Sequence, residues 1–265
     1  MSEELTISNP WSHLRKFTAA RIAIGRTGGS QPTHAVLDFR LSHARARDAV
    51  HAPFHPALLA AQLHGAGIQS QFLSTAVPDR TTYLLRPDLG RSLDAASREC
   101  LQPSKPDLVL IVSDGLAAAA AENHAAATLI PLIQELEAAS WKICPVQIIP
   151  LARVKVQDEI GSALGARFSL MLLGERPGLG TPDSLGAYFT ANPDPSCTDA
   201  DRNCVSNIRP EGIPPIEAAA KLAWLLKESM RLGLSGVHLK DNQVGSVSVA
   251  HDPRETSQGG ICGLG

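Results

Sequence analysis

The segment Asp107–Ser113 reads DLVLIVS, an apolar run with no polar residue between its two ends. A run of this length without polar alternation predicts a β-strand that is buried on both faces. Asp114-Gly115 then predicts a turn, and the Ala-rich segment Leu116–Ala139 predicts a long helix. A buried strand that leads directly into a helix is the repeating unit of α/β proteins with parallel sheets.

The same alternation continues toward the C-terminus. Apolar runs at Cys144–Ile149 and Phe168–Leu173 predict two more buried strands, with a helix between them at Lys155–Leu164. The remaining predicted elements are a strand at Ile68–Ser74, a short helix at Asp88–Cys100, a short strand at Tyr188–Thr190 and an amphipathic helix at Pro215–Leu232. We therefore expect an α/β fold in which residues 86–240 form a Rossmann-like parallel-sheet domain.

Toward the N-terminus the pattern is helical. The predicted helices are Pro10–Arg26, Thr33–His51 with Thr33 as its N-cap, and Pro56–Gly65, separated by segments rich in Gly and Pro. We expect residues 9–85 to form a small N-terminal helical region. Residues 241–265 are rich in Gly, Ser and Asn, and we expect them to be a flexible tail.

This helical region carries an excess of positive charge. Between Pro10 and Val50 the sequence has seven basic residues and two acidic ones. One interpretation is a solvated helical surface, and the other is a docking surface for a partner protein or an anionic group.

Composition excludes several classes of protein. The chain has 265 residues, 44% of them hydrophobic and 19% charged, which is enough apolar content for a core. A net charge of −2 argues against coating of nucleic acid, and no apolar run is long enough to span a membrane. No secretory signal is recognisable, and the five cysteines form no C-x-x-C pair. We expect a cytoplasmic protein with reduced thiols.

Ligands of open parallel sheets bind beyond the carboxyl ends of the strands. The loops of interest are therefore Ser113–Gly115, Arg153–Lys155, Gly174–Gly180 and Asp201–Ile208. The three glycines of Gly174–Gly180 would allow a close approach to a ligand, but their spacing matches neither a P-loop nor a dinucleotide-binding motif.

Two residues in these loops have alternative interpretations. Asp114 fits an acid, a ligand or a helix cap, and Cys204 fits either a thiol activated by an arginine or a small buried residue. The histidines show no zinc-binding spacing, and G-x-S-x-G is absent from the sequence. These residues alone leave open a stand-alone domain that binds a nucleotide-like ligand, and a hydrolase that uses Asp114 or Cys204.

Several longer motifs, in order along the chain, resemble the small (light) subunit of ethanolamine ammonia-lyase. These motifs are RKFTAARIAIGR at Arg15–Arg26, DRTTYLLRPDLGR at Asp79–Arg91, SDGL at Ser113–Leu116, GERPGLG at Gly174–Gly180 and DRNCVSNI at Asp201–Ile208. The resemblance covers about Asn9 to Lys240. It implies a subunit of a carbon–nitrogen lyase that converts ethanolamine to acetaldehyde and ammonia by radical chemistry with adenosylcobalamin.

The resemblance also implies where this chemistry takes place. The substrate site would lie in a separate large subunit, a TIM barrel, and the small subunit would cover the cobalamin from the other side as part of a hetero-oligomer. Val154, Glu175 and Cys204 match the positions that contact cobalamin in the family, and no catalytic residue or metal ligand is implied in this chain. Some members of the family have a long N-terminal extension linked to bacterial microcompartments. Only eight residues precede Asn9 here, so we expect a cytoplasmic protein, with packaging in a bacterial microcompartment as the alternative.

Overall fold

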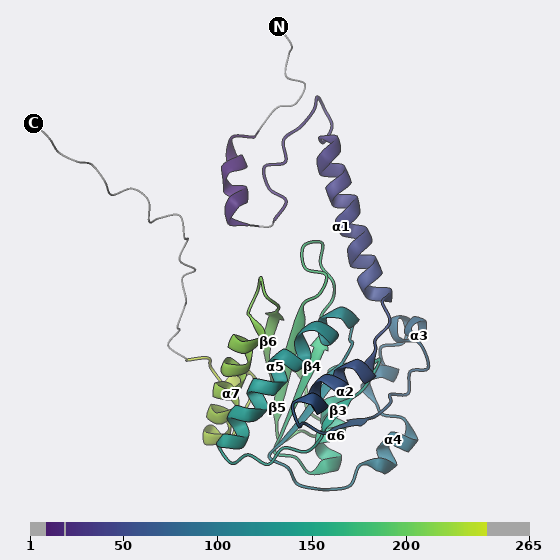
Figure 1. Cartoon of the computed structure of the whole chain (residues 1–265), viewed down its shortest axis with the longest axis vertical. Coiled ribbons are helices and arrows are strands. Elements are labelled where there is room, and N and C mark those ends of the chain that lie inside the picture. Colours follow the sequence, from purple (N-terminus) through teal and green to yellow (C-terminus); the bar gives the residue numbers. More distant parts are fainter. Residues whose placement is uncertain (1–8, 19, 243–265) are drawn as a thin grey trace, which may run out of the picture.

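A computed structural model of the chain describes residues 9–18 and 20–242. It contains a six-stranded sheet in the order β1-β3-β2-β4-β5-β6, with helices on both faces (Figure 1). The strands are β1 Ser70–Phe72, β2 Leu108–Ser113, β3 Val146–Ile148, β4 Phe168–Gly174, β5 Leu185–Ala191 and β6 Arg202–Ile208. The helices are α1 Thr33–His51, α2 Pro56–Gly65, α3 Arg80–Leu85, α4 Ala95–Cys100, α5 Ala118–Ala138, α6 Val156–Leu164 and α7 Pro215–Leu232. The α/β class is confirmed.

The sheet is mostly parallel, but the expectation of a purely parallel sheet is wrong. β1, β3, β2 and β4 pair in parallel, whereas β5 runs antiparallel to both β4 and β6. The ten residues from Glu175 to Ser184 join β4 to β5 without a helix. A parallel pairing needs a crossover connection of a dozen or more residues, so this shorter connection returns the chain antiparallel.

The two faces of the sheet carry separate cores. On one face α5 packs against α7, α2 and the strands, and this core includes Leu110, Leu170 and Phe189. On the other face α6 packs on β2 and β4, around Ile111 and Met171. All five side chains are fully buried, and each such burial contributes about 1.5–3 kcal/mol. This pattern explains why β2 and β4 are continuous apolar runs.

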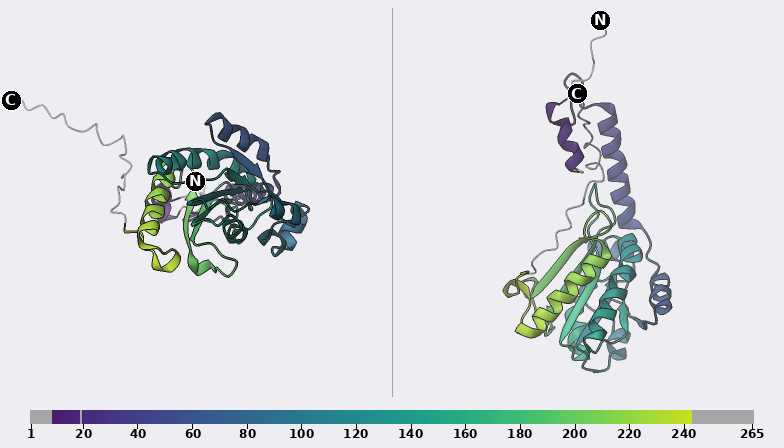
Figure 2. Two further views of the ribbon diagram at one scale, coloured as in Figure 1. Left: turned by 90° about the horizontal axis from the view of Figure 1, so that it is seen from below. Right: turned by 60° about the vertical axis from the view of Figure 1, so that its left-hand side comes forward.

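The N-terminal part extends away from the sheet. α1 projects from the body, and a 3-10 helix at Pro10–Phe17 lies beside it (Figures 1 and 2). The helix expected at Pro10–Arg26 therefore ends early. Ala23 and Gly25 have φ angles of 50° and 80°, and these left-handed conformations are incompatible with a continuing helix. α1 and α2 have the expected bounds, but the N-cap of α1 is Pro32, not Thr33, and no side chain caps it.

Two other predictions need correction. The segment Asp88–Cys100 contains a 3-10 turn at Leu89–Arg91 and the separate helix α4, because Asp94 caps α4 by accepting the N–H of Ser97 at 2.7 Å. The segment Asp201–Ile208, expected to be a loop, is mostly strand β6. The expected tail at 241–265 lies outside the described residues, apart from 241 and 242.

Candidate functional site

A cavity of about 740 Å³ opens beside α6, on the face of the sheet formed by β5 and β6. Its walls include Arg153, Val154 and Lys155 from the segment before α6, and Tyr188, Arg202 and Cys204 from the two antiparallel strands. Two of the three predicted cofactor-binding residues, Val154 and Cys204, thus face the same space. A smaller hollow of about 300 Å³ lies at the amino end of β3 and contains none of the three.

Cys204 lies directly across from Tyr188 in the register of β5 and β6. Desolvation, helped by the negative charge of Glu175, raises the pKa of the Cys204 thiol to about 11, although a hydrogen bond from Tyr188 opposes the shift. The thiol is therefore protonated at neutral pH, and this argues against an activated nucleophile.

Glu175 follows β4 and lies close to the same two side chains. Its carboxylate accepts hydrogen bonds from the Ser184 hydroxyl and, at 3.4 Å, from the N–H of Asn207. Gly186 makes room for it, because a Cβ atom there would come within 2.7 Å of Oε1. The charge of Glu175 also raises the pKa of Tyr188, after the larger effect of burial. Glu175 is thus grouped with Cys204 although it does not itself line the cavity.

Val154 lies in the turn that leads into α6, and the residue before it anchors that turn. The N–H of Arg153 donates to the carbonyl of Gly90 at 2.7 Å, and its guanidinium donates to the carbonyl of Tyr83 at 2.9 Å. The same guanidinium stacks on the Tyr83 ring, 4.0 Å from its centroid. These contacts hold half-buried Val154 at the edge of the cavity.

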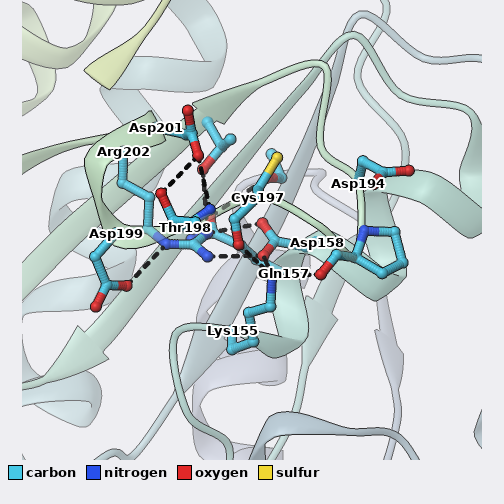
Figure 3. Close-up of polar contacts among 12 residues, drawn as sticks. Lys155, Gln157, Asp158, Asp194, Cys197, Thr198, Asp199, Asp201 and Arg202 are labelled. Atoms are coloured by element: carbon cyan, nitrogen blue, oxygen red, sulfur yellow. Dashed lines mark hydrogen bonds and ion pairs between the residues drawn. The ribbon is translucent and has the colours of Figure 1, made fainter. Parts of the chain in front are cut away.

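A buried ion pair joins the two walls of the cavity (Figure 3). Arg202 of β6 makes two hydrogen bonds of 2.7 Å to Asp158 of α6, and both side chains are almost completely buried. Lys155 lies 2.8 Å from the same carboxylate and donates to the backbone carbonyls of Pro195 and Cys197. The loop from β5 to β6 is therefore fastened to the first turn of α6. Sequence reasoning missed this cluster, because Asp158 next to Glu159 looks like an exposed helical face.

Of the three roles considered for Asp114, the helix cap is wrong. Its carboxylate pairs with Arg80 at 2.9 Å and accepts the N–H of Leu151 at 2.6 Å. α5 begins after Ala117 with no side-chain cap. Burial raises the pKa of Asp114, against these two interactions, and the residue joins the end of β2 to its neighbours. The geometry is that of a structural ion pair.

The glycines of the Gly174–Gly180 loop also serve the protein's own backbone. A Cβ at Gly174 would lie 2.2 Å from the carbonyl oxygens of Asp114 and Ala117, so only glycine lets β4 end against this turn. Gly178 exchanges backbone hydrogen bonds with Thr181. The close approach expected toward a ligand is, at Gly174, an approach to the turn after β2.

Within residues 9–18 and 20–242, no group of three metal-ligating side chains is close enough to hold an ion. No helix in that part of the chain is long and apolar enough to cross a membrane.

Comparison with known proteins identifies the family. A family model described as "Ethanolamine ammonia-lyase light chain (EutC)" matches residues 8–240. The chain belongs to the ethanolamine ammonia-lyase light-chain family. Among its relatives, the "Ethanolamine ammonia-lyase small subunit" of Ralstonia nicotianae is 49% identical over 239 residues, which is 88% of each chain. The proteins of the same name from Pseudomonas fluorescens and Azotobacter vinelandii are 50% identical, over 88% of this chain and 87% and 88% of theirs.

The resemblance seen in the sequence motifs is thereby confirmed, and its expected extent of Asn9 to Lys240 agrees with the matched range. As a light chain of an ammonia-lyase, the protein is part of a lyase. The description as a small subunit implies a large partner subunit. The stand-alone domain and the hydrolase considered from the residues alone are set aside.

Proposed function

We propose that this chain is the light subunit of an adenosylcobalamin-dependent ethanolamine ammonia-lyase, and that its cavity beside α6 covers one side of the cofactor. The observation that carries the proposal is the grouping of Val154, Glu175 and Cys204. They come from three separate segments and meet at or beside one cavity.

The surroundings of these residues suit the rim of a corrin ring. Glu175 offers carboxylate oxygens to amide N–H groups in the space left by Gly186, and Val154 offers backbone groups and methyl surface. Cys204, kept as a neutral thiol, is a small polarizable contact. When bound, adenosylcobalamin supplies radical chemistry for the conversion of ethanolamine to acetaldehyde and ammonia. The residues of this chain would bind and orient the cofactor, and we assign none of them a catalytic role.

The size of the cavity supports a shared site. Cavities of 300–1,000 Å³ enclose drug-sized ligands, and a corrinoid is considerably larger than these. A space of about 740 Å³ can cover only part of it. The rest would be covered by the large subunit, for which we propose the TIM barrel implied by the family resemblance.

We further propose that the N-terminal region docks on that subunit. Leu37, Phe39 and Leu41 on α1 are 57%, 45% and 51% exposed, and Trp11 and Phe17 of the preceding 3-10 helix are more exposed still. Exposed apolar side chains interspersed with arginines are typical of a protein–protein interface. This favours the docking interpretation of the basic region over a solvated surface.

Three finer assignments remain proposals. Of residues 9–85, the 3-10 helix and α1 would form the docking region, since α2 and β1 in the same range pack on the sheet domain. Residues 86–240 would supply most of a Rossmann-like cobalamin-contacting domain, supported by the parallel strands β3, β2 and β4 with α5 and α6 on opposite faces. The assembled enzyme would work in the cytoplasm, and fractionation of cells would show whether a microcompartment encloses it.

The test is reconstitution. The chain and a large subunit are produced separately and together, adenosylcobalamin and ethanolamine are added, and acetaldehyde is followed. We expect acetaldehyde only when both chains are present. Activity of this chain alone, or full activity of the large subunit without it, would overturn the proposal.

A further inference from the structure

The charges around the cavity do not balance. Four basic side chains line it, namely Arg91, Arg153, Lys155 and Arg202. Lys155 and Arg202 are neutralised by Asp158, and Arg202 also lies 3.4 Å from Asp199. Within the described part of the chain, Arg91 and Arg153 have no acidic partner.

These two arginines come from segments that touch. Arg91 ends the 3-10 turn Leu89–Arg91, and the carbonyl of Gly90 in that turn accepts the N–H of Arg153. A Cβ atom at Gly90 would lie 2.9 Å from Cγ of Arg153, so glycine is needed for this approach. The two guanidinium groups therefore belong to the same wall.

The two arginines are held differently. Arg153 is fixed on the Tyr83 ring, and its buried Nε–H has no acceptor in the described structure. A buried donor without an acceptor is unfavourable, and an incoming acceptor would relieve this cost. Arg91 is exposed and makes no side-chain hydrogen bond among the described residues. One rigid and one adaptable guanidinium beside a cavity form a receptor for a phosphate group, because arginine matches phosphate oxygens with paired donors.

We infer that Arg91 and Arg153 bind the phosphodiester of the nucleotide loop of cobalamin. That group is the one anionic substituent on the periphery of the cofactor. The inference rests on the proposed function and deepens it, because it assigns the nucleotide side of the cofactor to the wall formed by residues 89–91 and 153.

The test measures equilibrium binding to the complex with the large subunit, without turnover. Cyanocobalamin is compared with dicyanocobinamide, which lacks the nucleotide loop and its phosphate, by absorption titration. We expect Arg91→Gln to weaken cyanocobalamin binding about tenfold to a hundredfold and to leave cobinamide binding unchanged. We expect Arg153→Gln likewise to weaken the binding of cyanocobalamin and not that of cobinamide. Thermal unfolding checks that this variant folds. The control is Arg231→Gln, which removes an exposed arginine paired with Glu228 on α7 and does not line the cavity.

The outcomes separate the two proposals. If the wild-type complex binds neither corrinoid, the proposed function fails. If it binds both, and Arg91→Gln weakens both equally or neither, the function stands and the phosphate assignment is wrong. If Arg91→Gln prevents assembly with the large subunit, the arginines serve a carboxylate of the partner and the inference is overturned. Inorganic phosphate provides a further arm. Phosphate that binds the wild-type complex without competing with cyanocobalamin would mark a site for the free ion and would equally overturn it.

Discussion

A single carboxylate, that of Asp158, neutralises two cations from different parts of the chain. Arg202 lies 44 residues away in sequence, yet two of its nitrogens each lie 2.7 Å from an oxygen of the Asp158 carboxylate. Burying both groups is costly unless all their hydrogen bonds are made, and here Thr190 accepts a further bond from Arg202 at 3.2 Å. The pair sets the separation between the segment that bears Val154 and the strand that bears Cys204.

Removal of one partner should therefore be strongly destabilising. We expect Asp158→Ala to lower the free energy of unfolding by about 3–5 kcal/mol, because it leaves buried Arg202 with only the exposed carboxylate of Asp199, 3.4 Å away. Asp158→Ala combined with Arg202→Met should recover part of the loss. Urea unfolding of the two single variants and the double variant completes the thermodynamic cycle. If the loss of unfolding free energy in the double variant equals the sum of the two single losses, the two residues are not coupled.

The Cys204 thiol should react slowly with disulfide reagents. Its pKa of about 11, against an ordinary value of 9.0, reduces the thiolate fraction at pH 8 about a hundredfold. A more basic thiolate is also a better nucleophile, and this raises the rate constant of each thiolate about tenfold. The observed rate at pH 8 should therefore fall about tenfold rather than a hundredfold. Because the pKa is raised, the rate should keep rising about tenfold per pH unit beyond pH 9. Mass spectrometry of the Cys204 peptide measures the rate of modification at each pH. A rate that reaches a plateau at pH 9 would contradict the prediction.

Glu175→Ala should weaken cobalamin binding by the assembled complex about tenfold. The variant loses an acceptor beside the cavity and two local hydrogen bonds, so stability should fall by only about 1 kcal/mol. Glu137→Ala, on the far side of the molecule beside the smaller hollow, is the matched control. Unchanged cobalamin affinity in the Glu175 variant would argue against its placement at the cofactor.

At the scale of elements, the sequence predicted best where one physical rule dominates. β2, β4, α5, α6 and α7 were found because burial on both faces or on one helical stripe imposes a clear pattern. β6 was missed, since only Arg202, Val205 and Ile208 of its seven residues are buried and its polar residues do not alternate. The cavity-forming residues Cys204 and Arg202 lie on that strand. The site was therefore recognisable from motifs, but its geometry was not.

The projecting helix α1 should matter for assembly more than for folding. Replacing Leu37 and Leu41 with serine should change the free energy of unfolding of the isolated chain by no more than about 0.5 kcal/mol, because both side chains are exposed. The same variant should lose association with the large subunit in size-exclusion chromatography. Ile216→Ser, at a 62% exposed position on α7, serves as control. Retention of full association would remove α1 from the interface.

At the scale of the whole molecule, the proposed function makes this chain one wall of a site shared with the large subunit. The sequence already lacked a self-sufficient catalytic constellation, and the described structure places residues from two of the four candidate segments, Arg153–Lys155 and Asp201–Ile208, around an open cavity. What the sequence could not provide was the pairing of Asp158 with Arg202 or of Gly90 with Arg153, because both join segments more than 40 residues apart.

An incomplete site predicts weak binding by the isolated chain. We expect its affinity for cyanocobalamin to be at least about a hundredfold below that of the complex, because most of the ligand would remain in water. Titration of the chain with and without the large subunit measures this ratio. Equal affinities would mean that the cavity suffices by itself.

The shared carboxylate of Asp158 has a consequence for divergence within the family. A substitution there leaves buried Arg202 without its main partner, so we expect positions 158 and 202 on the two walls to change together among relatives. Insertions in the connection from β5 to β6 would disrupt a second set of contacts, because the carbonyls of Pro195 and Cys197 accept hydrogen bonds from Lys155. We expect length variation among relatives to avoid this connection and to occur instead in segments without such anchors.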